Sequence, residues 1–273
     1  MPLFGLGTWL SEDGAEAKNA VAEALRLGYQ MIDTATMYQN EASVGEAIQE
    51  YVAKPGGAIS REDLFIVTKL QGADHGSSAA RAAIDTSLEK LCMDYVDLWL
   101  IHNPSGGSVI ETWKALLAAR DEGKAKYVGV SNFGVEQLKG IKNAGLEMPQ
   151  VNQIEYHFAL QQKDTVDYCK QEGITLMGYC PLARRKLVGK TVLATIAQKL
   201  GITEAQLAIR WSAQTGVITI PKSTNKARIA ENAKALETVI PEDDMKAIAA
   251  LNELGFKASN SVNSMDLPWE SVQ

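Results

Sequence analysis

Residues 96–102, Val-Asp-Leu-Trp-Leu-Ile-His, are apolar at successive positions instead of at every second position. Seven other short runs have the same character, and they occupy residues 3–7, 31–35, 64–69, 127–131, 150–155, 175–179 and 217–221. A strand reads in this way when both of its faces are buried, as in a parallel sheet. The eight runs therefore predict eight buried parallel strands.

Segments with helical periodicity separate these runs. In residues 15–27 the apolar positions fall on one helix face, and Gly28 follows where a helix-ending glycine is expected. The same pattern predicts helices at residues 77–91, 108–122, 134–143, 162–172, 191–211, 225–236 and 242–251. The segment 191–211 is long enough for two helices broken at Gly201, with Thr203 as the N-cap of the second and Gln206 completing a capping box.

Strands that alternate with helices form either an open doubly wound sheet or a closed barrel. An open sheet that binds a dinucleotide needs G-x-G-x-x-G after its first strand, but here Gly5 and Gly7 are followed by Leu10 at the third position. No linker or shift in composition marks a domain boundary. We therefore expect an α/β fold, a single (β/α)8 TIM barrel spanning residues 1–273, with an irregular tail at 255–273.

The composition is that of an ordinary globular chain. Of the 273 residues, 46% are hydrophobic and 22% are charged, which argues against a disordered protein. The 27 Lys and Arg residues against 33 Asp and Glu residues give a net charge of −6, which argues against nucleic acid or an anionic membrane as a partner. No apolar run reaches the roughly 18–20 residues of a membrane helix. The three scattered cysteines and the lack of a secretory signal predict a cytoplasmic protein with free thiols, and we expect a monomer.

Polar residues follow three consecutive strands of the predicted barrel. Asp33 ends the second strand with Tyr38 just beyond it, Lys69 ends the third, and His102 ends the fourth. Taken singly, each residue type more often serves as a helix cap, a solvated charge or a structural histidine. Because the carboxyl ends of barrel strands meet at one rim, the four side chains are predicted to converge there.

The four residue types together suit a proton donor. A lysine ammonium about 4 Å from a tyrosine favours the phenolate, and Asp33 would pair with Lys69 and hold it in place. Neutral His102 would donate a hydrogen bond to an oxygen that gains negative charge. The set can protonate a carbonyl oxygen but supplies no hydride, so a cofactor is required. The three histidines lack the spacing of a metal site, and we expect no metal.

Several motifs, in order along the chain, resemble those of the aldo-keto reductase family. They lie at residues 4–9 (FGLGTW), 28–35 (GYQMIDTA), 38–41 (YQNE), 129–133 (GVSNF), 151–155 (VNQIE) and 220–223 (IPKS), followed by Arg228-Ile229 and Glu231-Asn232. The resemblance covers nearly the whole chain. It implies a (β/α)8 barrel and a catalytic tetrad made of Asp33, Tyr38, Lys69 and His102.

The resemblance also implies that NADPH lies across the barrel mouth. Ser131, Asn132 and Gln153 match residues that hold the nicotinamide carboxamide, and Tyr179 matches the ring that stacks on the nicotinamide. Lys222, Ser223 and Arg228 follow the last strand and open a helix, where two cations and a hydroxyl suit a 2′-phosphate. The full expected cofactor set is Thr8, Trp9, Asp33, Ser131, Asn132, Gln153, Tyr179, Cys180, Leu182, Lys222, Ser223, Arg228, Glu231 and Asn232, with Cys180 where a serine is more usual.

This chain departs from many relatives near the substrate. Gln71 and Asn103 stand where tryptophans are common, whereas Trp9 remains as a wall. The loop at 184–189 and the tail after Gly255 are short, and the N-terminal hairpin of many relatives is not seen. The substrate residues are predicted to be Trp9, Tyr38, Gln71, His102 and Asn103, in a wide and polar pocket.

We therefore expect an NADPH-dependent oxidoreductase that reduces a small or polar aldehyde or ketone, with Tyr38 as the general acid. Two alternatives stay open. A lyase on the same barrel would use Lys69 as a Schiff-base amine, which needs a lowered lysine pKa, whereas pairing with Asp33 raises it. A nicotinamide-binding regulatory protein on the same scaffold would act through a partner.

Overall fold

The computed structural model describes residues 1–54, 59–186, 189 and 191–273. All eight expected runs contain strands, which are β1 (Gly5–Gly7), β2 (Met31–Asp33), β3 (Phe65–Leu70), β4 (Val96–Ile101), β5 (Ala125–Ser131), β6 (Val151–Glu155), β7 (Thr175–Tyr179) and β8 (Ile218–Thr219). Their order in the sheet follows the chain, and each strand runs parallel to the next.

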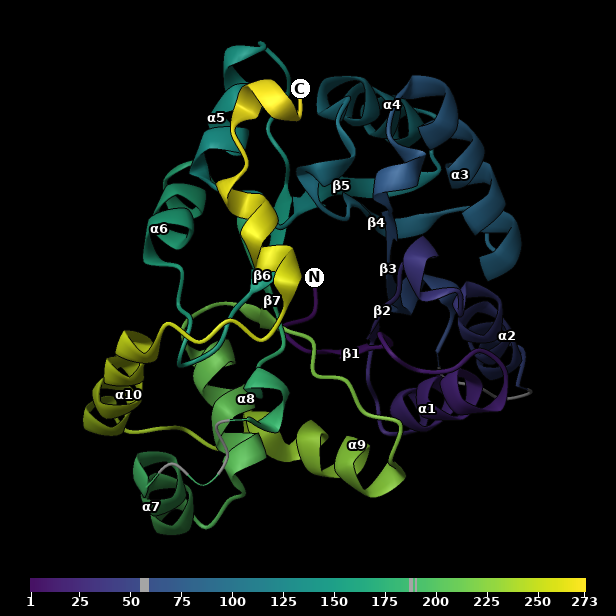
Figure 1. Ribbon diagram of the computed structural model, residues 1–273. Coiled ribbons are helices and arrows are strands. Elements are labelled where there is room, and N and C mark those ends of the chain that lie inside the picture. The colour runs from purple at the N-terminus through teal and green to yellow at the C-terminus, as the bar shows by residue number, and fades with distance from the viewer. Residues whose placement is uncertain (55–58, 187–188, 190) are drawn as a thin grey trace.

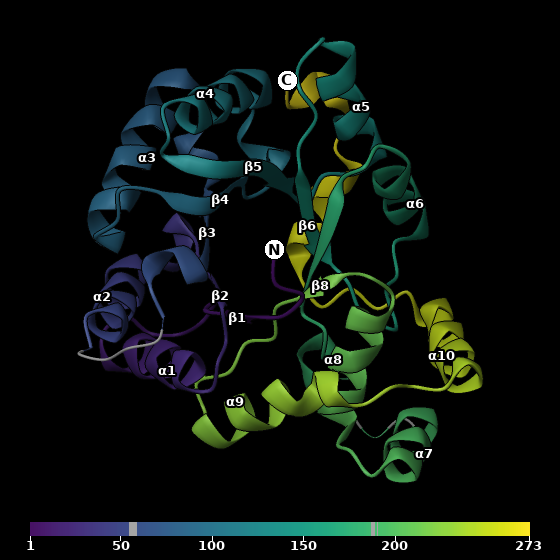
Figure 2. The same ribbon diagram turned by 180° about the vertical axis from the view of Figure 1, so that it is seen from behind.

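The sheet closes on itself. Parallel bridges join Phe4 to Thr219 and Gly7 to Lys222, so that β8 returns to β1. Figures 1 and 2 show the helices as a ring around these strands. The structure is the predicted (β/α)8 barrel, and the open doubly wound alternative is excluded. In the described chain β1 is the first element, with no hairpin before it.

The helices agree with most of the predicted segments. They are α1 (Ala15–Arg26), α2 (Glu41–Val52), α3 (Ser77–Leu91), α4 (Val109–Asp121), α5 (Val135–Asn143), α6 (Lys163–Gln171), α7 (Thr191–Leu200), α8 (Glu204–Gln214), α9 (Lys226–Ala233) and α10 (Glu242–Ala249). The break between α7 and α8 is confirmed, and Thr203 caps α8 by accepting from the Gln206 N–H. Short 3₁₀ turns are η1 (Thr36–Tyr38), η2 (Arg61–Asp63), η3 (Gly72–Asp74), η4 (Pro104–Gly106), η5 (Ala183–Arg185), η6 (Lys234–Glu237), η7 (Ala250–Leu254), η8 (Asn260–Asp266) and η9 (Trp269–Ser271).

Helix α2 was not among the predicted helices. Gly45 is the one glycine of this helix, and it has a packing role. A Cβ at Gly45 would clash with the backbone of Leu91 at the end of α3. The glycine therefore lets α2 and α3 approach closely on the outside of the barrel.

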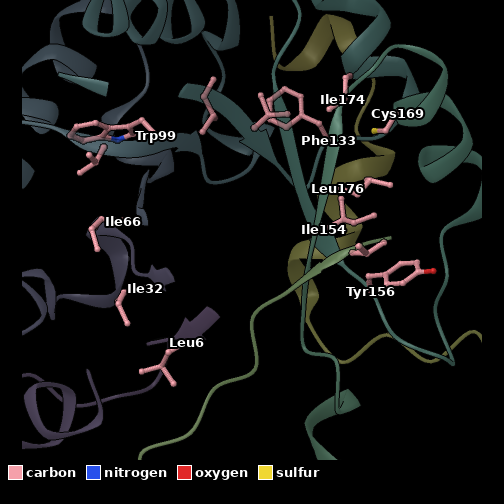
Figure 3. Close-up of a cluster of buried hydrophobic side chains, with 14 of the residues drawn as sticks. Leu6, Ile32, Ile66, Trp99, Phe133, Ile154, Tyr156, Cys169, Ile174 and Leu176 are labelled. Atoms are coloured by element: carbon pink, nitrogen blue, oxygen red, sulfur yellow. The ribbon is translucent and has the colours of Figure 1, made fainter. Parts of the chain in front are cut away.

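Side chains of the strands alternate between two apolar clusters. The inner cluster fills the barrel and consists of Met31, Phe65, Val67, Leu98, Leu100, Val151, Met177, Ile218 and Ile220. The outer cluster packs the strands against the helices and includes Leu6, Ile32, Ile66 and Trp99 (Figure 3). Because successive residues of a strand point to opposite faces, Asp33, Lys69 and His102 follow the inward-facing series of their strands.

The tail at 255–273 forms η8 and η9 and packs against the barrel. Figure 1 shows it in yellow, passing β6 and β7 on its way to α5. The Val109 N–H donates to the Val272 carbonyl at 2.9 Å, and a Cβ at Gly140 of α5 would clash with the Trp269 indole. Within the part of the chain that the structure describes, no helix has the length and apolar character to cross a membrane.

Candidate active site

Asp33, Lys69 and Tyr38 meet at the carboxyl ends of β2 and β3. The Lys69 Nζ lies 2.6 Å from the Asp33 Oδ1, 2.8 Å from the Thr34 carbonyl oxygen and 3.4 Å from the Tyr38 hydroxyl. Tyr38 is carried by η1, and this turn is tied to β3 because the Thr36 hydroxyl donates to the Lys69 carbonyl at 2.9 Å. The structure thus brings these three residues together, as predicted.

Lys69 is fully enclosed, with no exposed side-chain surface. Burial lowers the pKa of Lys69, and the neighbouring Asp33 carboxylate opposes this shift. From the sequence we expected pairing with Asp33 to raise the pKa of Lys69, but in the structure the effect of burial is larger. The three contacts of Nζ use all three donors of an ammonium.

The pKa of Tyr38 lies well above its ordinary value, because the phenol is buried and faces the Asp33 carboxylate. We expected Lys69 to lower this pKa. The Lys69 ammonium lies 3.4 Å from the Tyr38 hydroxyl but only 2.6 Å from the Asp33 Oδ1, and this carboxylate offsets the field of the ammonium. Burial therefore decides the direction of the Tyr38 pKa shift. Tyr38 therefore stays protonated at neutral pH.

His102 forms the other side of the site. Its ring packs edge-on against the Tyr38 ring, with centroids 5.6 Å apart. Burial and the Lys69 charge lower the pKa of His102 from 6.5 to about 3, so the imidazole is neutral at physiological pH. Its Nδ1 is buried without a partner among the described residues.

Asn132 and Gln153 connect this cluster to β5, β6 and β7. The Gln153 Nε2 donates to the Asp33 Oδ2 at 2.7 Å, so the carboxylate is held by Lys69 on one oxygen and by Gln153 on the other. The Asn132 Nδ2 donates to the His102 carbonyl at 2.9 Å, and the Tyr179 hydroxyl donates to the Asn132 Oδ1 at 2.7 Å. The sequence did not reveal that the expected carboxamide ligands also fix the tetrad.

A single cleft of about 470 Å³ opens above these residues. Most of the expected site residues line it, namely Trp9, Asp33, Tyr38, His102, Ser131, Asn132, Gln153, Tyr179, Cys180, Leu182, Lys222, Ser223, Arg228, Glu231 and Asn232. Thr8, Lys69, Gln71 and Asn103 do not line it. Lys69 lies beneath the cleft, and the Thr8 hydroxyl donates to the Asp33 carbonyl. Both residues therefore contact Asp33, which lines the cleft, without lining it themselves.

Gln71 and Asn103 are held in local turns. Gln71 precedes η3, and its backbone N–H donates to the Asp74 carboxylate. The Asn103 Oδ1 accepts from the Ser105 N–H at 3.0 Å. Neither residue is among those that line the cleft, and their contact with the substrate stays a prediction.

The far end of the cleft is cationic. Arg228 lies in the first turn of α9, where the Asn225 side chain caps the helix by accepting from the Arg228 N–H. Burial lowers the pKa of Lys222, and the Arg228 charge lowers it further. Two cations held near each other in this way favour an anion between them. The cleft thus has amide groups at one end, with the Tyr179 ring beside Asn132, and cations at the other end. This set of groups fits an extended dinucleotide.

Twelve residues that line the cleft were not among the expected site residues, and Met37, Arg184, Ser259 and Ser261 are four of them. Met37, Ser259 and Ser261 line its wall, and the Arg184 guanidinium lies 4.4 Å from the centre of the Trp9 ring. Ser259 and Ser261 belong to the tail, which has no periodicity to signal a function. The loop at 184–189, which was expected to shape the pocket, is described at residues 184–186 and 189, and its residues 187–188 lie outside the described part.

A closed (β/α)8 barrel with a buried Asp-Lys pair and a cleft at the carboxyl ends of its strands has the architecture of a barrel enzyme, whose active site lies at that end. A family model described as the aldo/keto reductase family matches residues 4–253. The chain belongs to the aldo-keto reductase family, whose members use nicotinamide cofactors.

Individual relatives are similar over nearly their full length. An uncharacterized oxidoreductase, YtbE, of Bacillus subtilis (strain 168) is 47% identical over 93% of this chain and 90% of its own. Glyoxal reductase of the same strain is 42% identical over the same shares of the two chains. Among solved structures, MGS-M4, an aldo-keto reductase from a Medee basin deep-sea metagenome library, is 38% identical with a TM-score of 0.86, covering 93% of this chain and 92% of its own.

Proposed function

We propose that this protein is an NADPH-dependent reductase of small polar aldehydes and dicarbonyls, and that Tyr38 is its general acid. The observation that carries the proposal is the chain of contacts from Asp33 through Lys69 to the Tyr38 hydroxyl, at the floor of the cleft and beside neutral His102.

The bound reduced nicotinamide supplies the hydride. Ser131, Asn132 and Gln153 would hold its carboxamide, and Tyr179 would lie against its ring. Gln153 donates to Asp33 through its amide N–H₂, which leaves the amide oxygen to accept from a carboxamide. The Lys222 and Arg228 cations at the other end would hold a 2′-phosphate, and we therefore expect NADPH to be preferred to NADH.

Tyr38 donates its proton to the carbonyl oxygen as that oxygen becomes an alkoxide. Its raised pKa keeps the phenol protonated until it is needed. As the proton leaves, the phenolate faces the Lys69 ammonium at 3.4 Å, an attraction of at most about 5 kcal/mol at an effective dielectric constant of about 20. Lys69 thus acts on the transition state more than on the resting phenol.

His102 orients the substrate. A neutral imidazole is a hydrogen-bond donor that does not compete with Tyr38 for the proton transfer, because its own pKa lies at about 3. Because the His102 Nδ1 is buried, we assign the Nε2 of the ring as the donor to the substrate oxygen.

The proposed substrate class rests on the cleft walls and on one relative. Trp9, Met37 and Leu182 are among the apolar side chains that line the cleft, and the tail adds the hydroxyls of Ser259 and Ser261. The 42% identical relative is named for reduction of glyoxal, a small dicarbonyl.

The test is NADPH oxidation by the wild type and by Tyr38→Phe, with glyoxal, methylglyoxal, a simple aldehyde and a large apolar ketone. Tyr38→Phe removes the proton donor and retains the ring that packs on His102, so turnover should fall about 10²- to 10⁴-fold with an unchanged Kd for NADPH. Turnover by Tyr38→Phe within a few-fold of the wild type would remove Tyr38 from the mechanism.

The two other functions are less well supported by the geometry. A Schiff-base lyase needs an accessible amine, but Lys69 is enclosed and its three donors are engaged, although its pKa is lowered in the direction that such chemistry needs. Trapping of substrate on the protein by borohydride would favour the lyase. Tight NADPH binding without turnover on every carbonyl would favour the regulatory protein.

A further inference from the structure

Glu155 is a buried acid that the proposed reaction does not use. It is the last residue of β6, it has no exposed surface, and it pairs in register with Tyr179 of β7. Its Oε1 accepts from the Ala258 N–H at 2.6 Å, and its Oε2 accepts from the Ser259 N–H at 2.7 Å. One side chain of the barrel rim thus receives two successive backbone donors of the tail.

The third partner of Glu155 is also a donor. The His157 Nδ1 accepts from the Ala159 N–H at 3.3 Å, so the proton of a neutral ring resides on Nε2, which lies 2.9 Å from the Glu155 Oε1. As a carboxylate, Glu155 offers acceptor lone pairs to all three donors. Charge-assisted bonds of this kind are about twice as strong as neutral ones, which makes Glu155 a strong anchor for the tail.

The anchored segment is part of the cleft. Ser259 and Ser261 both line it, and the Ser261 N–H donates to the Ser259 Oγ at 3.2 Å, which fixes the two serines relative to each other. Ser259 also lies against Tyr179: burial and the charge of Glu155 raise the pKa of Tyr179, and the Ser259 hydroxyl opposes that shift. Figure 2 shows the tail behind β6, in agreement with its course past β6 in Figure 1.

We propose that Glu155 is a positioning residue: its buried carboxylate fastens the tail so that Ser259 forms the wall of the substrate cleft beside Tyr179. The kinetic part of this inference rests on the proposed function, whereas the fastening of the tail does not.

Glu155→Gln is the decisive variant because it keeps the shape and removes one acceptor. If the Gln N–H₂ takes the place of Oε1, it faces the Ala258 N–H; if it takes the place of Oε2, it faces the Ser259 N–H. Either orientation of the amide therefore opposes one tail donor. We expect at least tenfold faster hydrogen exchange of the tail amides around 258–261, a rise of about tenfold in KM for glyoxal, and a kcat within about twofold of the wild type, since the tetrad is untouched.

Asp97→Asn is the matched control. Asp97 is also buried, accepts from the Ile66 N–H at 2.9 Å and pairs with Arg61, but it lies near the start of β4, at the opposite end of the barrel. It should lower stability without changing tail exchange or KM. Ser259→Ala tests the wall directly and should raise KM. It removes the acceptor of the Ser261 N–H but should leave the exchange of the Ala258 and Ser259 amides, which Glu155 binds, unchanged. This variant carries the test if Glu155→Gln does not fold.

The outcomes are separable. Unchanged tail exchange in Glu155→Gln, or faster exchange with an unchanged KM, overturns the proposal, as does an equal rise of KM in Asp97→Asn. With Ser259→Ala alone, an unchanged KM overturns it. If the wild type reduces no carbonyl, the proposed function fails, while hydrogen exchange still decides whether Glu155 fastens the tail.

Discussion

Replacing His102 with Gln should make the stability of the fold less sensitive to acid. Burial and the Lys69 charge lower the pKa of His102 from 6.5 to about 3 in the folded protein. The unfolded chain takes up a proton below about pH 6.5, but the folded chain does so only near pH 3. The stability associated with the neutral ring is therefore present above pH 6.5 and is lost as the pH falls toward 3.

The size of this effect follows from the two pKa values. Between pH 7.5 and pH 5.0 the unfolded chain gains nearly one proton at this position and the folded chain gains almost none, which costs about 2 kcal/mol of stability. Gln does not titrate, so His102→Gln should lack this part of the acid sensitivity.

The assay is urea unfolding, followed by circular dichroism, of the wild type and His102→Gln at both pH values. All other titrating groups, including His75, are shared and cancel in the difference between the two proteins. The wild type should lose about 2 kcal/mol more than the variant over this interval. An equal loss in both proteins would show that the His102 ring titrates alike in the folded and unfolded states, and the case for a neutral donor would fail.

Two further predictions concern the charged groups of the site. Asp33→Asn leaves the Lys69 ammonium buried without its carboxylate and should lower the free energy of unfolding by about 3–5 kcal/mol, measured by urea denaturation at neutral pH; a loss below about 1 kcal/mol would mean that the pair is not buried as described. Arg228→Ala should weaken NADPH binding by about 10- to 100-fold in a fluorescence titration, because a charge-assisted contact to the 2′-phosphate is lost, and should leave NADH binding unchanged. Equal affinities of the wild type for the two cofactors would count against a phosphate site at Arg228.

The fold and the floor of the site were accessible from sequence because they depend on short-range periodicity. Alternation along β2, β3 and β4 sends Asp33, Lys69 and His102 to the inside, and parallel strands bring their carboxyl ends together. The motif resemblance then placed most of the cleft-lining residues correctly. Helix α2 was missed, although its close packing on α3 shows that it is an integral part of the barrel.

Other features depend on contacts that sequence spacing does not encode. Gln153 reaches Asp33 across 120 residues, and Glu155 reaches Ala258 across 103 residues. Gln71 was placed in the pocket by the position of a family residue, but it does not line the cleft. The direction of the Tyr38 pKa shift also escaped prediction, because it is set by the depth of burial and not by the neighbouring residue types.

The seam between β1 and β8 has a consequence for the order in which a ribosome delivers this chain. Phe4 is made long before its bridge partner Thr219, which lies near the other end of the barrel sequence. Until then β1 keeps an unpaired edge, and closing so long a loop makes this a late step of folding. Ser259 and Ser261 emerge later still, so a product that stops after the last strand has a barrel without the final wall of its cleft.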